Sequence, residues 1–136
     1  LEQHALGIAL GADGAVRLMP GLVRIPDVSF ISWGRLPGRE LPEDPIADLV
    51  PDLTVEVLSR RNTKREMDRK LREYFVAGSR LVWLVQPKTQ TAQIYTSPTD
   101  SRRVGKTQAL DGGTVLPGFS LPLKQLFASP RRKTDR

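Results

Sequence analysis

The sequence predicts an α/β or α+β domain, a central mixed β-sheet flanked by helices, and three observations support this fold class. Short apolar stretches bounded by Gly, Pro and Asp precede residue 50, as in strands separated by turns. One amphipathic helix is predicted near the middle of the chain, where apolar residues recur at helical spacing. Further apolar and alternating stretches follow it. The 136 residues have the length of one domain with a sizeable core.

The N-terminal third is predicted to consist of short strands. Residues 8–10 and 15–19 are expected to pair as a hairpin, because an Asp-Gly step suited to a tight turn lies between them. Residues 22–25 and 28–31 predict two more strands on either side of a Pro-Asp step. A polar, Pro- and Gly-rich connection is expected over residues 32–50, and a connection of that length is often functional.

The central segment contains the most strongly predicted elements. Residues 53–58 are β-branched and nearly all apolar, which is typical of a central strand covered on both faces. Thr63 and Glu66 form a capping box, so a helix is expected to begin at Lys64, and Gly78 is suited to end it. The apolar stripe of this helix consists of Met67, Leu71, Tyr74 and Phe75.

The C-terminal part is predicted to return to β-structure. Residues 81–85 and 92–96 are expected to form a hairpin. Downstream we expect a polar loop over residues 97–106 and a short strand over residues 108–110. An irregular stretch over residues 115–121 and one helical turn over residues 123–127 are expected to follow. Residues 1–128 would form the single domain, and residues 129–136 a basic, disordered tail. Because the chain begins with Leu1 rather than Met, we expect its natural N-terminal portion to be missing.

The composition restricts the chemistry. With 39% hydrophobic and 26% charged residues the chain is typical of soluble globular proteins, and no apolar run approaches the roughly 18 residues of a membrane span. The chain has no cysteine, which excludes a thiolate zinc site, and with a single histidine, His4 near the start, neither a Ser–His–Asp site nor a His-based zinc site is expected. Any metal must be bound by oxygen, which favours Mg²⁺. The lack of cysteine also fits a reducing compartment, and we expect a cytoplasmic protein.

The positive charge is concentrated in two places. The last six residues, RRKTDR, carry +3 of the formal net charge of +6. Seven basic residues also fall within residues 60–72, against only two acidic ones: Arg60, Arg61, Lys64, Arg65, Arg69, Lys70 and Arg72. Such a run is usually a solvated helix face. Its position next to Glu56 makes contact with nucleic-acid phosphates the slightly favoured interpretation.

Glu56 is the residue that most strongly indicates a functional site. A carboxylate in an apolar central strand is costly unless it is paired. Asp27, at the start of a predicted strand, would complete a pair of Mg²⁺ ligands if the two strands are neighbours. Lys70 lies at the edge of the apolar stripe of the helix, so its amine can reach Glu56 and orient an attacking water. Together these residues predict a site for phosphodiester hydrolysis.

Each of these residues also has a structural interpretation. Asp after Pro is most often a turn residue, and Lys beside an apolar stripe often only extends along it to solvent. Glu56 could be neutralised by an ion pair with Arg72 or Arg24 instead of a metal. From the residues alone, the metal site and the ion pair remain equal alternatives.

Four ordered motifs resemble one family of proteins. They are RIPDVSFIS, PDLTVEVLSRRNTKREMDRK, LREYFVAGSRLVWLVQP and LPGFSLPLKQLF, and the resemblance that they carry covers residues 21–127. The motifs resemble the Uma-type restriction endonuclease family, a branch of the PD-(D/E)xK superfamily. The resemblance implies a restriction-endonuclease-like core with a central mixed sheet flanked by helices.

The resemblance also implies roles for individual residues. Asp27 of the IPDV motif and Glu56 of the VEVLS motif take the metal-binding roles, with Mg²⁺ as the expected ion and Mn²⁺ as a substitute. Lys70 takes the role of the motif lysine, displaced onto the following helix, since Leu58 stands where a strand-borne ExK motif has lysine. Gln86 departs from the acid usual in WLVDP. The helical N-terminal region common in the family, which could supply another acid, is also absent or cut off.

The leading hypothesis is therefore a Mg²⁺-dependent endonuclease that hydrolyses phosphodiester bonds in DNA, with Asp27, Glu56 and Lys70 as catalytic residues. The expected partners are DNA and, if both strands are cut, a second copy of the chain in a homodimer. No membrane and no small-molecule cofactor are expected. The alternatives are a non-catalytic nucleic-acid-binding or scaffold module that keeps the nuclease fold, and a structural domain in which Glu56 only pairs with an arginine.

Overall fold

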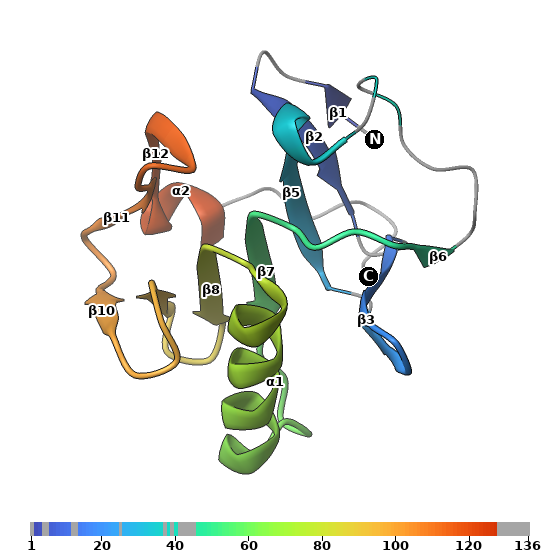
Figure 1. Ribbon diagram of the computed structural model, residues 1–136. Helices are drawn as coiled ribbons and strands as arrows, with labels where there is room; N and C mark the ends of the chain where they lie inside the picture. The colour runs from blue at the N-terminus through green and yellow to red at the C-terminus, as the bar shows by residue number, and fades with distance from the viewer. Residues whose placement is uncertain are drawn as a thin grey trace, which may run out of the picture.

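The computed structural model (Figure 1) describes residues 2–3, 6–11, 14–24, 26–36, 38, 40 and 46–127. The strands are β1 (Glu2–Gln3), β2 (Gly7–Leu10), β3 (Ala15–Met19), β4 (Leu22–Arg24), β5 (Val28–Ser32), β6 (Ile46–Ala47), β7 (Leu53–Val57), β8 (Leu81–Gln86), β9 (Thr91–Tyr95), β10 (Ser101–Val104), β11 (Ala109–Gly112) and β12 (Leu116–Pro122). The helices are the 3₁₀ turn η1 (Trp33–Arg35), α1 (Lys64–Ala77) and α2 (Leu123–Phe127).

A seven-stranded mixed sheet forms the centre of the fold, in the order β1-β2-β5-β7-β8-β9-β10. Strands β7 and β8 are parallel, and the other neighbours in this sheet are antiparallel. Two parallel neighbours need a crossover connection, and α1 provides it. The predicted mixed sheet with a flanking helix is therefore confirmed.

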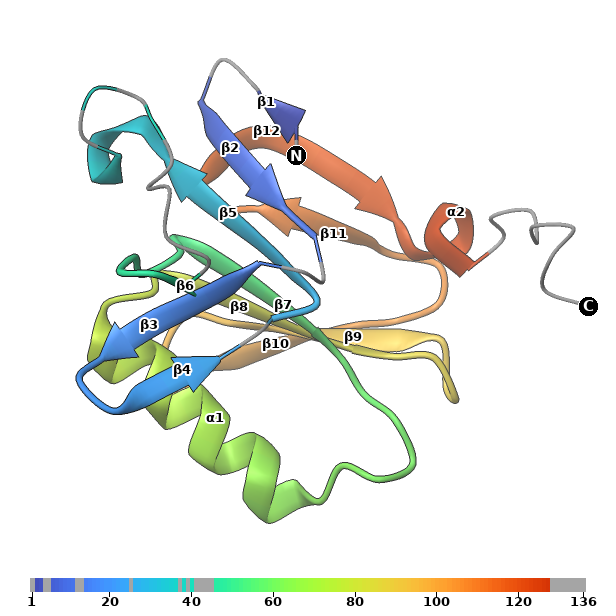
Figure 2. The same ribbon diagram turned by 90° about the vertical axis from the view of Figure 1, so that its right-hand side faces the viewer.

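Different elements cover the two faces of this sheet (Figure 2). Helix α1 and the small β4-β3-β6 sheet lie over one face, while the β11–β12 hairpin and α2 lie over the other. Along β7, Leu53 and Val55 pack into the cluster on the β11–β12 side. Side chains alternate along a strand, so Thr54 and Glu56 face α1. The layer between the sheet and α1 therefore contains the carboxylate of Glu56.

Helix α1 forms as the sequence predicts. The Thr63 hydroxyl accepts a hydrogen bond from the Glu66 backbone N–H at 3.1 Å, which caps the first turn. Gly78 ends the helix with a φ of +120°, a conformation that residues with a Cβ rarely adopt. Met67, Leu71 and Tyr74 are buried against the sheet. The cap fixes which residues of the helix face inward, and thereby positions Lys70 and Tyr74.

The N-terminal hairpin prediction is wrong. Strand β2 pairs with β5 in the central sheet, whereas β3 pairs with β4 in the small sheet. The apolar side chains explain the difference, since Ile8 packs with Ile31 while Val16 packs against the residues of α1. Residue 13 of the predicted turn lies outside the described residues, as do His4 and the predicted tail.

Three further predictions are corrected by the structure. Val28, whose apolar side chain in a predicted strand was expected in the core like that of Phe30, is exposed because it is the first residue of β5, whereas the following residues are buried. The predicted loop over residues 97–106 contains β10, a polar strand that can carry charge because it lies at the sheet edge. Residues 115–121, expected to be irregular, largely form β12, which pairs with β11 across a bulge.

No helix in the described part of the chain is long and apolar enough to cross a membrane.

Candidate active site

The structure brings Asp27 next to Glu56. Strands β5 and β7 are antiparallel neighbours with Val28 opposite Val55, so continuing this register places Asp27 opposite Glu56. The backbone N–H of Val57 donates to Asp27 Oδ2 at 2.7 Å and holds the carboxylate at the end of β7. The predicted pair of carboxylates required these two strands to be neighbours, and in the structure they are.

Glu56 is held by two residues of α1. Only 6% of Glu56 is exposed. The Lys70 ammonium lies 3.0 Å from Glu56 Oε1, and the Tyr74 hydroxyl donates to Oε2 at 3.2 Å. Lys70 and Tyr74 are four residues apart, so they follow one another on the same side of the helix. Both oxygens of the buried carboxylate therefore have a donor.

The environment keeps the Tyr74 hydroxyl protonated. Burial raises the pKa of Tyr74 above its ordinary value of 10.0, and the negative charge of Glu56 and the hydrogen bond to it raise the pKa further. The charge of Arg24 lowers this pKa, and that of Asp27 raises it. At neutral pH the phenol is therefore a hydrogen-bond donor to Glu56.

The predicted alternative, an ion pair between Glu56 and an arginine, does not form. Arg24 pairs with Glu73, with 3.0 Å between Nε and Oε1, and Arg72 lies on the exposed side of α1. The cation that contacts Glu56 is Lys70. A lysine amine is a mobile point charge that can move from the carboxylate to a neighbouring group.

Two carboxylates are available to a metal. Among the described residues, no group of three or more His, Asp or Glu side chains is arranged to bind an ion. Asp27 Oδ1 accepts no hydrogen bond within the described part of the chain, and Glu56 Oε1 has only Lys70 as a donor there. Mg²⁺ is commonly bound by one or two carboxylates, with water and substrate phosphate as its other ligands. The donor set fits this ion.

Asp52 is a buried carboxylate that sequence reasoning missed. It lies just before β7, at the opposite end of this strand from Val57, and is almost fully buried. Arg35 and Arg80 each approach Asp52 Oδ1 at 3.0 Å, and the Ser32 backbone N–H donates to Oδ2 at 2.6 Å. These contacts connect Asp52 to three other segments of the chain, so we assign it a structural role. Its partners are distant in sequence, and no local pattern pointed to them.

Arginines between residues 60 and 72 differ from most others in the described structure. Five arginines elsewhere are ion-paired: Arg17, Arg24, Arg35, Arg80 and Arg102. Five arginines of the segment are exposed and have no ion-pair partner among the described residues: Arg60, Arg61, Arg65, Arg69 and Arg72. Arg60 and Arg61 lie in the connection between β7 and α1, close along the chain to Glu56. The segment therefore presents guanidinium groups that are available to phosphates.

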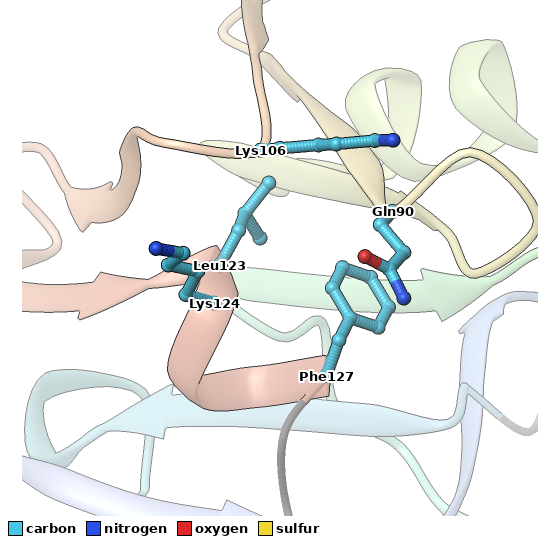
Figure 3. A pocket seen from close by; sticks show the side chains of 5 residues that line it. All are labelled: Gln90, Lys106, Leu123, Lys124 and Phe127. Carbon is cyan, nitrogen blue, oxygen red and sulfur yellow. The ribbon is translucent and has the colours of Figure 1, made fainter.

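A separate hollow of about 280 Å³ lies beside α2 and the β8–β9 turn (Figure 3). Its walls are formed by Gln90, Lys106, Leu123, Lys124 and Phe127. None of the predicted site residues lines it, and its lysines are exposed at the surface. The three residues predicted from the sequence lie instead between β7, the start of β5 and α1.

The mixed sheet with α1 as the crossover between its two parallel strands is the core that the restriction-endonuclease-like resemblance implied. The chain belongs to the Uma2 family, described as "Putative restriction endonuclease", whose family model matches residues 1–124. The predicted family and fold class are therefore confirmed.

A solved structure has the same fold. It is described as that of "a putative nuclease belonging to DUF820" from Anabaena variabilis. The two chains are 20% identical with a TM-score of 0.74, over 90% of this chain and 68% of the other. No protein among the curated ones matches the sequence.

Proposed function

We propose that the protein is a Mg²⁺-dependent endonuclease that hydrolyses phosphodiester bonds in DNA. The observation that carries the proposal is the constellation of Asp27, Glu56 and Lys70. Asp27 lies just before β5, opposite Glu56 of β7, and the Lys70 amine is 3.0 Å from Glu56. Membership of a family described as restriction endonucleases supports the same reaction class.

Each residue has a distinct role in this proposal. Asp27 and Glu56 would hold Mg²⁺ through one carboxylate oxygen each. When bound, Mg²⁺ would neutralise charge on the scissile phosphate. Lys70, displaced from Glu56 Oε1, would donate a hydrogen bond to the attacking water and offset the negative charge that develops on the phosphate. Because Glu56 is buried, water screens its charge poorly, and its attraction for a metal cation would be strong.

Replacement of Asp27 tests this proposal. The Asp27→Asn variant keeps an acceptor for the Val57 N–H but loses the negative charge. Partners of metal ligands contribute about 10- to 100-fold, so for a direct ligand we expect Mg²⁺ binding and cleavage to weaken by at least that much. The measurement is Mg²⁺-dependent cleavage of supercoiled plasmid and of single-stranded DNA, with EDTA as the metal-free control. Cleavage by the wild-type protein that persists in EDTA would contradict the metal-dependent mechanism.

The unpaired arginines support DNA as the substrate. We expect the Arg60→Ala, Arg61→Ala double variant to bind a DNA duplex more weakly than the wild-type protein. The slope of log K against log salt should be shallower by about 2, since each phosphate contact contributes about 0.9 to this slope. Fluorescence anisotropy in EDTA measures binding without cleavage. The Arg102→Ala, Arg103→Ala variant is the matched control, because it removes the same charge from the edge strand β10. Equal slopes for all three proteins would count against phosphate contacts at Arg60 and Arg61.

A non-catalytic DNA-binding module is the second candidate. The observation in its favour is that the described residues supply two acids near the site and no third. Wild-type protein that binds DNA with a steep salt dependence, yet neither binds Mg²⁺ nor cleaves DNA, would establish this alternative. Cutting both strands would need two sites, which a homodimer could supply by symmetry.

A further inference from the structure

We propose that Tyr74 is a positioning residue for the metal ligand Glu56. Its hydroxyl would hold Glu56 Oε2 so that Oε1 alone exchanges between Lys70 and the metal. This inference rests on the proposed function, because it assigns a role to Tyr74 within the same site. In the sequence Tyr74 is only a member of the apolar stripe, and its contact with Glu56 emerges from the fold.

The two donors that hold Glu56 differ in mobility. Lys70 has a long flexible side chain, 24% exposed, that ends 3.0 Å from Oε1. Tyr74 has a rigid ring, is 1% exposed, and donates to Oε2 at 3.2 Å. The Lys70 amine can therefore swing into solvent or towards a phosphate at low cost, while the Tyr74 hydroxyl cannot leave its position. The contact that persists when Lys70 moves is the one from Tyr74.

Packing alone does not require the hydroxyl of Tyr74. The ring belongs to the cluster between α1 and the sheet, in contact with an apolar environment that includes Leu71 and Val82. A phenylalanine ring would occupy the same volume. A buried phenol is costly without a partner, and the partner that Tyr74 has is the carboxylate of Glu56. The hydroxyl therefore serves the orientation of Glu56.

A fixed orientation matters for a metal ligand. A glutamate side chain has three rotatable bonds, and an unrestrained carboxylate must lose that freedom when it binds an ion. Groups that hydrogen-bond to metal ligands typically contribute 10- to 100-fold in metal affinity or activity by setting ligand orientation. Tyr74 is placed to do this for Glu56, as the Val57 N–H is for Asp27.

The Tyr74→Phe variant tests the inference by metal binding without DNA. Isothermal titration with Mn²⁺ should show about 10- to 100-fold weaker binding than in the wild-type protein. In cleavage assays at saturating Mg²⁺, kcat should fall while KM for DNA stays unchanged, because the phosphate contacts are intact. A purely structural role would instead alter thermal unfolding and leave both the Mn²⁺ affinity and kcat of the folded protein unchanged.

Tyr95→Phe is the matched control. Tyr95, on β9, packs against the same cluster as Tyr74, but its hydroxyl donates to Gln93 Oε1 at 3.0 Å and not to Glu56. Removing this hydroxyl should leave Mn²⁺ binding and cleavage as in the wild-type protein. An equal loss in both variants would overturn the inference, since it would show a general effect of removing a phenol hydroxyl.

A second pair of variants separates the inference from the proposed function. If Tyr74 acts through Glu56, adding Tyr74→Phe to Glu56→Gln should cause no further loss of Mn²⁺ affinity. Independent, additive losses would overturn the positioning role, as would wild-type Mn²⁺ affinity in Tyr74→Phe. In both cases the wild-type protein would still bind metal and cleave DNA, so the proposed function would stand. A wild-type protein that binds no Mn²⁺ would overturn the proposed function and this inference with it.

Discussion

Replacing Glu56 by Gln is expected to lower the rate of Mg²⁺-dependent DNA cleavage by at least about 100-fold. Partners of metal ligands already contribute 10- to 100-fold, and a direct ligand should contribute no less. Glutamine fills the same volume and its carbonyl oxygen can still accept the hydrogen bond from Tyr74. The variant therefore removes the negative charge and leaves the packing between α1 and the sheet intact.

The same substitution should change stability only modestly. It breaks the ion pair with Lys70, whose side chain is partly exposed and can turn its amine into water. We expect a loss of about 1.5 kcal/mol in the free energy of unfolding, the lower end of the range for one hydrogen bond to a charged group. Plasmid cleavage measures the rate and urea denaturation the stability, so a catalytic loss can be distinguished from unfolding.

Glu73→Gln is the matched control for this experiment. Glu73 lies on α1 and pairs with Arg24, so the variant also removes one carboxylate from one ion pair of the same layer. Glu73 has no contact with Asp27 or Glu56, and cleavage should remain within a few-fold of the wild-type rate. Equal cleavage by the wild-type protein and Glu56→Gln would refute the assignment of Glu56 as a metal ligand.

The largest expected effect on stability belongs to Asp52. Asp52→Asn removes the charge that neutralises Arg35 and Arg80 and weakens the bond from the Ser32 N–H. Breaking a buried ion pair by removing one partner typically costs 3–5 kcal/mol. Both arginines keep some access to water, so we expect a loss of about 3 kcal/mol in the free energy of unfolding.

Asp48→Asn provides the comparison for Asp52→Asn. Asp48 pairs with Arg17 at 3.3 Å on the exposed surface, where such a pair contributes about 0–1 kcal/mol. Urea denaturation of both variants should therefore show a large shift of the midpoint for Asp52→Asn and a small one for Asp48→Asn. Similar shifts would show that the burial of Asp52 does not determine its contribution to the free energy of unfolding.

The elements that the sequence predicted well are those determined by local interactions. The capping box at Thr63, the apolar stripe and Gly78 all act within one helix, and α1 spans the expected residues. The helical period also placed Lys70 at the edge of the stripe. The apolar run of β7 was recognised because every residue but Glu56 favours a buried strand.

The predictions that failed depended on partners distant in the chain. The turn between β2 and β3 was locally plausible, but burial of Ile8 and Val16 in different clusters assigns the strands to different sheets. Strand β10 has no apolar alternation because it lies at an exposed edge, so its polar sequence resembled a loop. Asp52 could not be recognised, since its arginines come from two other segments.

For the candidate site, the sequence by itself identified Glu56 as a carboxylate whose burial would be costly without a partner. It also set Lys70 and Tyr74 one helical turn apart. The catalytic roles of Asp27, Glu56 and Lys70 stay predictions. Only the tertiary structure decided that β5 pairs with β7, which brings Asp27 opposite Glu56, and that α1 holds both oxygens of this carboxylate. The physical reason is that helix spacing is fixed by bonds between near neighbours, whereas strand pairing depends on how the whole chain buries its apolar side chains.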